Sequence, residues 1–179
     1  MKIAITGHTR GIGQAIYNSL INTHSVIGLG RSNGYDINDT ETIINAVKDC
    51  DCFVNNAYSD LQQEILLKEI NALWQGQNKI IINVGSAVTD YPRLQAELND
   101  EPWDYRDNKQ ALVKTFRQLV HAGTDQPLLK LLTPGAVDTD LIKHIDCAKL
   151  DPKEIAHAVD ILINNPYIKE MTVKPYYGK

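Results

Sequence analysis

Apolar and polar positions along this chain follow two different periods. Short runs rich in Ile, Val and Leu are separated by longer amphipathic stretches, an alternation typical of βαβ units around a parallel sheet. It predicts strands near residues 2–6, 25–29, 51–55, 79–85, 127–133 and 169–174. It predicts helices near residues 11–22, 39–49, 61–75, 104–122 and 152–164, and the segment 33–38 is compatible with a further short strand.

Two of the apolar runs, at 80–84 and 128–132, are compact and bounded by turn residues, as expected for strands covered on both faces. We therefore expect them near the centre of the sheet. Asp39-Thr40 and Asp151-Pro152 are typical cap and first-turn signals for two of the helices. The sequence thus predicts an α/β fold in which a single, doubly wound parallel sheet carries helices on both faces, in the Rossmann-like manner.

Length and charge narrow the classes of function. The 179 residues, 43% of them hydrophobic, suffice for one core and leave little for a substrate lobe, so residues 1–179 are expected to form one domain. A net charge of −4 without clustered Lys and Arg argues against nucleic acid as a partner. The first strand begins without a cationic leader, and no stretch approaches the roughly 18 apolar residues of a membrane span, so we expect a soluble, cytoplasmic protein that does not bind membranes.

The cysteines indicate no special chemistry. Cys50, Cys52 and Cys147 form neither a CxxC motif nor an even set. We therefore expect reduced core cysteines rather than a disulfide or a metal site.

A glycine-rich loop at 6–13 (TGHTRGIG) directly follows the first predicted strand. Gly7 permits a tight exit from the strand, Gly11 permits close approach of a phosphate, and Gly13 lets the following helix pack on the sheet. Backbone N–H groups at the start of that helix would face the anion. The loop therefore predicts a dinucleotide site, with an ordinary strand-to-helix turn as the alternative.

The end of the second strand bears on the choice of dinucleotide. An acidic residue there would bind a ribose 2′-hydroxyl, but this chain has Gly30-Arg31-Ser32. Arg31 and Arg10 could both reach a 2′-phosphate through bidentate, charge-assisted hydrogen bonds. We expect NADP(H) rather than NAD(H), and the alternative is that one or both arginines are solvated surface charges.

Tyr105 and Lys109 lie four residues apart, on one face of a predicted helix. A tyrosine has an ordinary pKa of about 10, too high for efficient proton exchange near pH 7. A unit positive charge about 4 Å away, at an effective dielectric near 20, contributes roughly 4 kcal/mol, or about 3 pKa units. Ser86, at the carboxyl end of a predicted central strand, would hydrogen-bond a substrate oxygen, with a cap or turn role as the alternative.

These segments together resemble the short-chain dehydrogenase/reductases, as an unusually short member. Residues 6–13 match that family's TGxxxGIG loop, 55–58 (NNAY) its NNAG motif, 105–109 its YxxxK and 134–139 (PGAVDT) its PGxVxT, all in family order. The resemblance implies catalytic roles for Ser86, Tyr105 and Lys109, with the lysine also holding the cofactor ribose. The expected cofactor-binding residues are Gly7, Thr9, Arg10, Gly11, Ile12, Gly13, Arg31, Ser32, Asp36, Ile37, Asn56, Ala57, Pro134, Gly135, Val137 and Thr139.

The chain departs from the family pattern at several places. The family's relay asparagine has no counterpart between 58 and 77 other than Asn71, so water, Gln62 or Gln63 would have to replace it. Tyr58 stands where the family has a glycine, which would narrow the nicotinamide pocket or move the loop.

Other positions are open to two interpretations. Asn55 is expected to hold strand and loop together through its amide, and Asp36 is equally suited to forming a turn after Asn33-Gly34. The extra loop at 90–103 is expected to form the substrate mouth, with Tyr91 and Trp103 as apolar walls.

The leading functional hypothesis is an NADPH-dependent carbonyl reductase, or alcohol dehydrogenase in reverse, with Tyr105 as general acid/base. Only about ten residues separate Thr139 from the next predicted helix, so the pocket is expected to be shallow and the substrate a small carbonyl or hydroxy compound. The alternative is a non-catalytic NADP(H)-binding sensor or scaffold. The resemblance also implies a homo-oligomer, a dimer or tetramer, with segments 61–75 and 104–122 as the contact surface.

Overall fold

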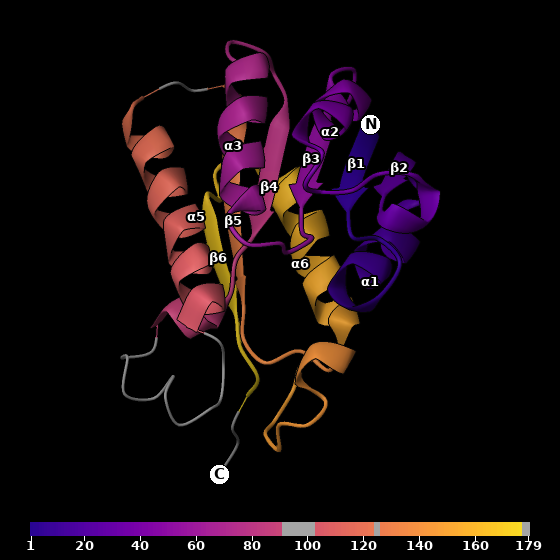
Figure 1. The fold of residues 1–179 in the computed structure, drawn as a ribbon, viewed down its shortest axis with the longest axis vertical. Coiled ribbons are helices and arrows are strands. Elements are labelled where there is room, and N and C mark those ends of the chain that lie inside the picture. Colours follow the sequence, from indigo (N-terminus) through magenta and orange to yellow (C-terminus); the bar gives the residue numbers. More distant parts are fainter. Residues whose placement is uncertain (91–102, 124–125, 177–179) are drawn as a thin grey trace.

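The computed structural model describes residues 1–90, 103–123 and 126–176. Its strands are β1 (Lys2–Thr6), β2 (Ser25–Leu29), β3 (Cys52–Asn55), β4 (Ile80–Val84), β5 (Leu128–Pro134) and β6 (Glu170–Val173). Its α-helices are α1 (Gly11–Leu20), α2 (Thr40–Val47), α3 (Gln62–Leu73), α5 (Trp103–His121) and α6 (Pro152–Asn164), and short 3-10 turns lie at Arg31–Asn33, Ala87–Asp90 and Asp140–Ile142. The six strands form one parallel sheet in the order β2-β1-β3-β4-β5-β6 (Figure 1).

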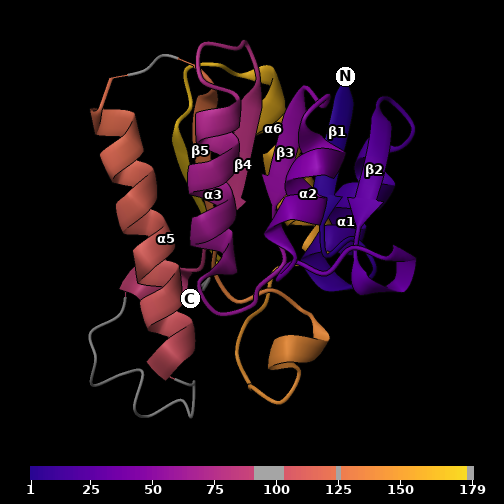
Figure 2. The same cartoon turned by 45° about the horizontal axis from the view of Figure 1, so that its top comes forward.

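Helices cover both faces of this sheet. Helices α1 and α6 pack together on one face, and α2, α3 and α5 lie side by side on the other (Figures 1 and 2). Alternate residues of each inner strand enter the two cores: Ile80, Ile82 and Val84 of β4 face α1 and α6, whereas Ile81 faces α3 and α5. The strand period of two therefore explains why Ile80, Ile81, Ile82 and Val84 are all apolar, and Asn83, the polar residue of this strand, is buried as well.

The predicted strands and helices are confirmed, with their ends within two residues of the predicted ones. Both cap signals are confirmed too, because Asp39 accepts a hydrogen bond from the backbone N–H of Thr42 and Asp151 accepts one from that of Lys153. The doubly wound parallel sheet is the predicted fold class.

Two expectations were wrong. The segment 33–38 forms no strand, because the side chain of Asn33 bonds the backbone of Gly28 and Gly30, and Gly34 has a φ of 88°, which turns the chain away from the sheet. Cys147 is exposed rather than in the core, whereas Cys50 and Cys52 are buried and all three are free thiols.

The sheet has its switch point at β1. From β1 the chain first adds β2 on one side and then crosses to β3 on the other, so a crevice opens at the carboxyl ends of β1 and β3. Within the described ranges, no helix combines the length and apolar character needed to cross a membrane. The expected substrate-mouth wall Tyr91, with most of its loop, lies outside the described residues, as does the side chain of Trp103.

Candidate active site

A cleft of about 760 Å³ lies at the carboxyl ends of the strands, within the size range of ligand pockets. It runs from the glycine loop, past the turn after β2 and the loop after β3, to the first turns of α5. Its walls include fifteen of the residues expected from the sequence: Gly7, Thr9, Arg10, Gly11, Ile12, Gly13, Arg31, Ser32, Asp36, Ile37, Asn56, Ala57, Tyr105, Lys109 and Thr139. Residues far apart in the sequence therefore meet at one edge of the sheet.

The glycine loop forms a cradle with no room for side chains at its base. A Cβ on Gly13 would lie 2.1 Å from the carbonyl oxygen of Gly7, and Gly7 and Gly11 have φ values of 71° and 54°. In contrast to α2 and α6, helix α1 has no side-chain cap from its N-cap residue, Arg10. Its first N–H groups therefore face the cleft as an anion-binding surface, which fits the pyrophosphate of a dinucleotide.

Thr6 connects the glycine loop to the loop after β3. Its buried hydroxyl accepts hydrogen bonds from the backbone N–H groups of Asn56 and Ala57, each at 3.0 Å, and the Asn56 amide donates to the Thr6 carbonyl at 3.0 Å. Sequence reasoning assigned Thr6 no role, although it opens the glycine motif. Its hydroxyl fixes the backbone that forms the middle of the cleft.

Two exposed arginines, Arg10 and Arg31, lie at the end of the cleft next to β2. Arg10 precedes α1, Arg31 begins the turn after β2, and both belong to the cleft wall with Ser32. Asp36 has both properties considered from the sequence: it lines the cleft, and its carboxylate accepts hydrogen bonds from the backbone and side chain of Asn38 at 2.9 and 3.0 Å.

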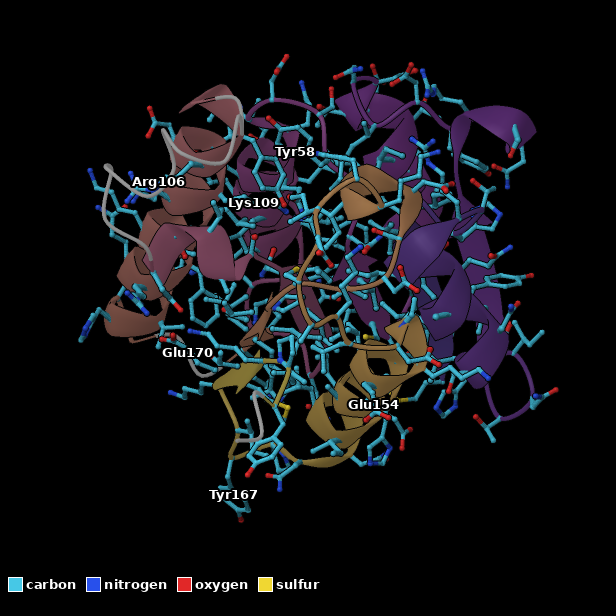
Figure 3. The ribbon with its side chains drawn as sticks, turned by 90° about the horizontal axis from the view of Figure 1, so that it is seen from below. Tyr58, Arg106, Lys109, Glu154, Tyr167 and Glu170 are labelled. Atoms are coloured by element: carbon cyan, nitrogen blue, oxygen red, sulfur yellow. The ribbon has the colours of Figure 1, made fainter. Side chains whose placement is uncertain are left out.

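Tyr105 and Lys109 meet at the opposite end of the cleft. The ammonium of Lys109 lies 5.6 Å from the centre of the Tyr105 ring and 5.7 Å from that of Tyr58, and Figure 3 shows Tyr58 and Lys109 side by side. The Tyr58 and Tyr105 rings meet edge to face at 4.7 Å, and the Tyr58 hydroxyl accepts a hydrogen bond from Asn108 at 3.1 Å. The Tyr58 ring therefore packs against Tyr105 and lies beside Lys109, and 41% of the surface of Tyr58 is exposed.

Lys109 is buried, with only 3% of its surface exposed. Its ammonium donates to the side-chain oxygen of Gln63 at 2.5 Å and to the carbonyl oxygen of Val84 at 2.9 Å. Burial lowers the pKa of Lys109 to about 7, while the two accepting oxygens favour its charged form. The ammonium is therefore not the permanent cation that the sequence argument assumed, because its charge depends on this local environment.

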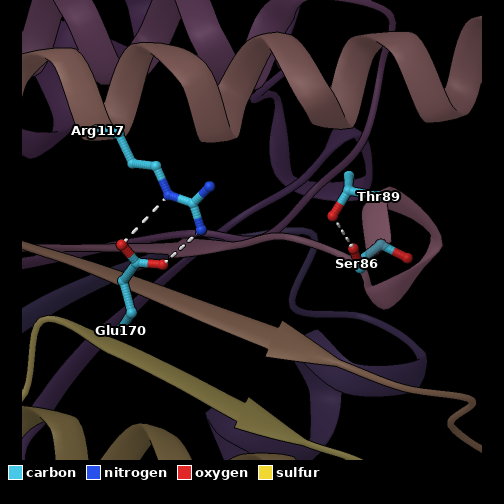
Figure 4. A network of polar contacts seen from close by, with 4 residues as sticks. All are labelled: Ser86, Thr89, Arg117 and Glu170. Atoms are coloured by element: carbon cyan, nitrogen blue, oxygen red, sulfur yellow. Dashed lines mark hydrogen bonds and ion pairs between the residues drawn. The ribbon is translucent and has the colours of Figure 1, made fainter. Parts of the chain in front are cut away.

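Four expected site residues are absent from the cleft wall. The hydroxyl of Ser86 accepts a hydrogen bond from the Val88 N–H at 3.3 Å, and its carbonyl accepts one from Thr89, as in a turn (Figure 4). Val137 is a core side chain next to the bridge with Leu150, and Pro134 and Gly135 end β5 beside β6. Their assignment as site residues stays a prediction.

The cleft also contains residues that the sequence analysis did not select. They follow directly on selected motifs or belong to the strand ends that meet here, and they are Thr6, Leu29, Gly30, Tyr35, Asn38, Ile43, Ser59, Val84, Gly85, Asp140 and Leu141. Their position at the carboxyl ends of parallel strands is the signal that could have found most of them.

Comparison with known proteins gives matches in structure only. No protein-family model matches the sequence, and no curated protein matches it. A short-chain dehydrogenase from Burkholderia cenocepacia J2315 in complex with NADP matches with a TM-score of 0.80 at 17% identity, covering 96% of this chain and 86% of the other. A 3-ketoacyl-(acyl-carrier-protein) reductase from Brucella melitensis complexed with NADH matches with a TM-score of 0.77 at 17% identity, and the match covers 97% of this chain and 96% of the other.

A third match is the 3-alpha-hydroxysteroid dehydrogenase from Pseudomonas sp. B-0831 complexed with NADH. Its TM-score is 0.73 at 22% identity, and the match covers 97% of this chain and 95% of that one. At such identities the likeness establishes the fold. The chain has the fold of the short-chain dehydrogenase/reductases, as the motifs predicted.

The first prediction concerns the close contact between Gly13 and the carbonyl oxygen of Gly7. Gly13→Ala places a methyl group against the Gly7 carbonyl, so the backbone must shift, and we expect a loss of about 1–3 kcal/mol in the free energy of unfolding. Gly30→Ala is the matched control in the same cleft, because no atom lies closer than 3.4 Å to the added Cβ. Denaturant unfolding measures both, and an equal, small effect of the two substitutions would contradict the close contact.

The buried ammonium makes the second prediction. The pKa of Lys109 is about 7 in the folded protein against 10.5 in a solvated chain, so the unfolded state binds more protons between these values. The free energy of unfolding should therefore rise with pH from about 7 to 10 more steeply than in Lys109→Met, by an amount on the order of several kcal/mol. Urea unfolding across this pH range tests it, and parallel curves for the two proteins would show that Lys109 titrates normally.

Proposed function

We propose that this chain is a short-chain dehydrogenase/reductase that reduces a small carbonyl compound with NADPH, or oxidises the corresponding alcohol. The observation that carries this proposal is one cleft with a glycine cradle at one end and the Tyr105–Lys109 pair at the other. Its neighbours in fold support the class, because the three structures compared above hold NADP or NADH. They differ in cofactor, so the preference for NADPH rests on this chain's own residues.

The cofactor would lie along the cleft with its pyrophosphate on the start of α1. When bound, it supplies the hydride that reduces the carbonyl carbon. The hydroxyl of Tyr105 then donates a proton to the developing alkoxide, which leaves a phenolate near the ammonium of Lys109. In a buried, poorly solvated site this charge stabilises the phenolate strongly, and the neighbouring rings of Tyr58 and Tyr105 exclude water around it.

Ser86 is absent from the cleft wall, so its side chain would have to reorient to hold a substrate oxygen. This observation, together with Tyr58 packed on Tyr105, favours the second candidate, a protein that binds NADP(H) without turnover. Both candidates share the cofactor site and differ only in the chemistry at Tyr105.

We also propose that the chain forms a homo-oligomer through α3 and its neighbour α5. Large apolar side chains of and before α3, Leu61, Ile65 and Leu73, are 36–44% exposed. Exposed apolar groups gathered at one helix are typical of surfaces that a second copy covers. Sedimentation of the purified chain gives the oligomeric state directly.

The role of Tyr105 is tested by replacement with phenylalanine. Tyr105→Phe removes the proton donor and keeps the ring against Tyr58, so we expect carbonyl reduction to fall by a factor of about 10² or more with NADPH affinity nearly unchanged. The assay follows loss of the NADPH absorbance with a panel of aldehydes, ketones and quinones. Tyr167→Phe is the matched control, because that ring is 92% exposed and outside the cleft.

Two outcomes would change the proposal. Turnover that survives Tyr105→Phe would exclude the mechanism. NADPH binding without turnover on any compound of the panel would instead support the non-catalytic alternative.

The preference for NADPH is tested by titration. Arg10→Ala and Arg31→Ala each remove a cation at the adenosine end, so we expect NADPH affinity to fall by roughly tenfold or more, with little change for NADH. Arg117→Ala is the matched control, because Arg117 pairs with Glu170 outside the cleft (Figure 4). NADH that binds as tightly as NADPH to the unchanged protein would show that the arginines do not select the cofactor.

A further inference from the structure

Gln63 is a polar side chain on the buried face of a helix. It lies at helical spacing with Leu66, Leu67 and Ile70, all of which are in the core between α3 and the sheet, and it is only 2% exposed. A buried amide without partners would destabilise the fold, so its hydrogen bonds indicate why glutamine stands at an apolar position.

The hydrogen bonds of Gln63 fix the direction of its amide. Its nitrogen donates to the carbonyl oxygens of Asn55 at 2.8 Å and Val84 at 3.2 Å. Only one orientation places the amide N–H groups toward two carbonyls, and that orientation turns the amide oxygen toward the ammonium of Lys109, 2.5 Å away. Asn55 completes the arrangement by donating from its own amide to the backbone carbonyl of Gln63 at 2.7 Å.

The ammonium of Lys109 has three N–H groups to place. Two of them donate to Gln63 and Val84, which leaves one for a ligand in the cleft that Lys109 lines. The groups around it from the other packed elements are the phenols of Tyr58 and Tyr105 and the amides and carbonyls of α3 and β4. Burial alone accounts for the lowered pKa of Lys109, and no described charged group contributes to it.

We propose that Gln63 is the positioning residue of this site: its amide oxygen stabilises the charged form of Lys109 and directs the ammonium toward Tyr105. The proposal rests on the proposed function for its catalytic consequence, and on geometry alone for its effect on Lys109. A neutral acceptor stabilises the charged lysine without adding a counter-charge, which leaves the ammonium's field available to the phenol. A carboxylate in the same place would hold the proton more tightly and reduce that field.

The neighbouring Gln62 provides a matched control. The sequence left water, Gln62 or Gln63 open as replacements for the family's relay asparagine. In the structure the amide oxygen of Gln62 accepts a hydrogen bond from the hydroxyl of Thr40 at 3.3 Å, toward α2. Gln62→Leu therefore makes the same chemical change on the same helix without touching Lys109.

The direct test measures the titration of Lys109 without any substrate. In the purified full chain, the Cε signal of Lys109 is followed by NMR against pH with ¹³C-labelled lysine, and Lys109→Met assigns the signal. We expect Gln63→Leu to lower the midpoint by about one pH unit or more and Gln63→Glu to raise it, whereas Gln62→Leu leaves it unchanged. If Gln63→Leu fails to fold, the upward shift of the Lys109 midpoint in Gln63→Glu still tests the proposal. Midpoints that agree among Gln63→Glu, Gln62→Leu and the unchanged protein would overturn the proposal.

The catalytic consequence is tested in the reductive direction. The active form has a protonated Tyr105 and a protonated Lys109, so loss of the first proton from this coupled pair sets the alkaline limb of the pH–rate profile. Gln63→Leu should move that limb to lower pH and Gln63→Glu to higher pH, whereas a purely structural effect would lower the rate equally at every pH. If the chain turns over no carbonyl compound but the NMR midpoints shift as expected, the proposed function fails and the role of Gln63 stands. If the enzyme is active but the NMR midpoints do not shift, the proposed function stands and the role of Gln63 fails.

Discussion

The candidate site depends on one physical constraint, which is that the ammonium of Lys109 is buried inside the protein. A buried charge is costly unless hydrogen bonds compensate it, and Lys109 donates two such bonds, to a side chain of α3 and to a carbonyl at the end of β4. These partners come from segments about 46 and 25 residues away in the sequence. The ammonium can therefore be accommodated only when the loop after β3, the start of α3 and the end of β4 are correctly assembled.

The parallel sheet brings these groups together. Its strands all end at one edge, so Thr6 of β1, Asn55 of β3 and Val84 of β4 meet within one hydrogen-bonded layer. At the glycine cradle the layer offers backbone N–H groups, and at Lys109 it offers a cation. The backbone N–H groups of the cradle are suited to an anion, as the proposed dinucleotide would require.

Most of the fold could be predicted from the sequence because its strands and helices have strong and different apolar periods. The turn after β2 could not, since 33–38 contains residues suited to either a strand or an Asx-type turn, and the side chain of Asn33 decides between them. At the site, the glycine loop and the Tyr105–Lys109 spacing predicted correctly which segments lie in one cleft. The choice between Gln62 and Gln63 was left open in the sequence analysis. The spacing of Gln63 from Leu66, Leu67 and Ile70 nevertheless indicates that Gln63 is the one on the buried face of the helix.

Tyr58 is one of the places where the chain departs from the family pattern, because the NNAG motif has a glycine there. A glycine at this place would leave the Tyr105 ring and Lys109 open to the cleft, whereas the Tyr58 ring contacts one edge to face and lies 5.7 Å from the other's ammonium. The Tyr58 ring shields the ammonium of Lys109 from water, and the amide oxygen of Gln63 accepts a hydrogen bond from it. Desolvation lowers the pKa of Lys109, whereas this hydrogen bond raises it. The charge on Lys109 near neutral pH is set by the balance between its burial and the hydrogen bonds that its ammonium donates.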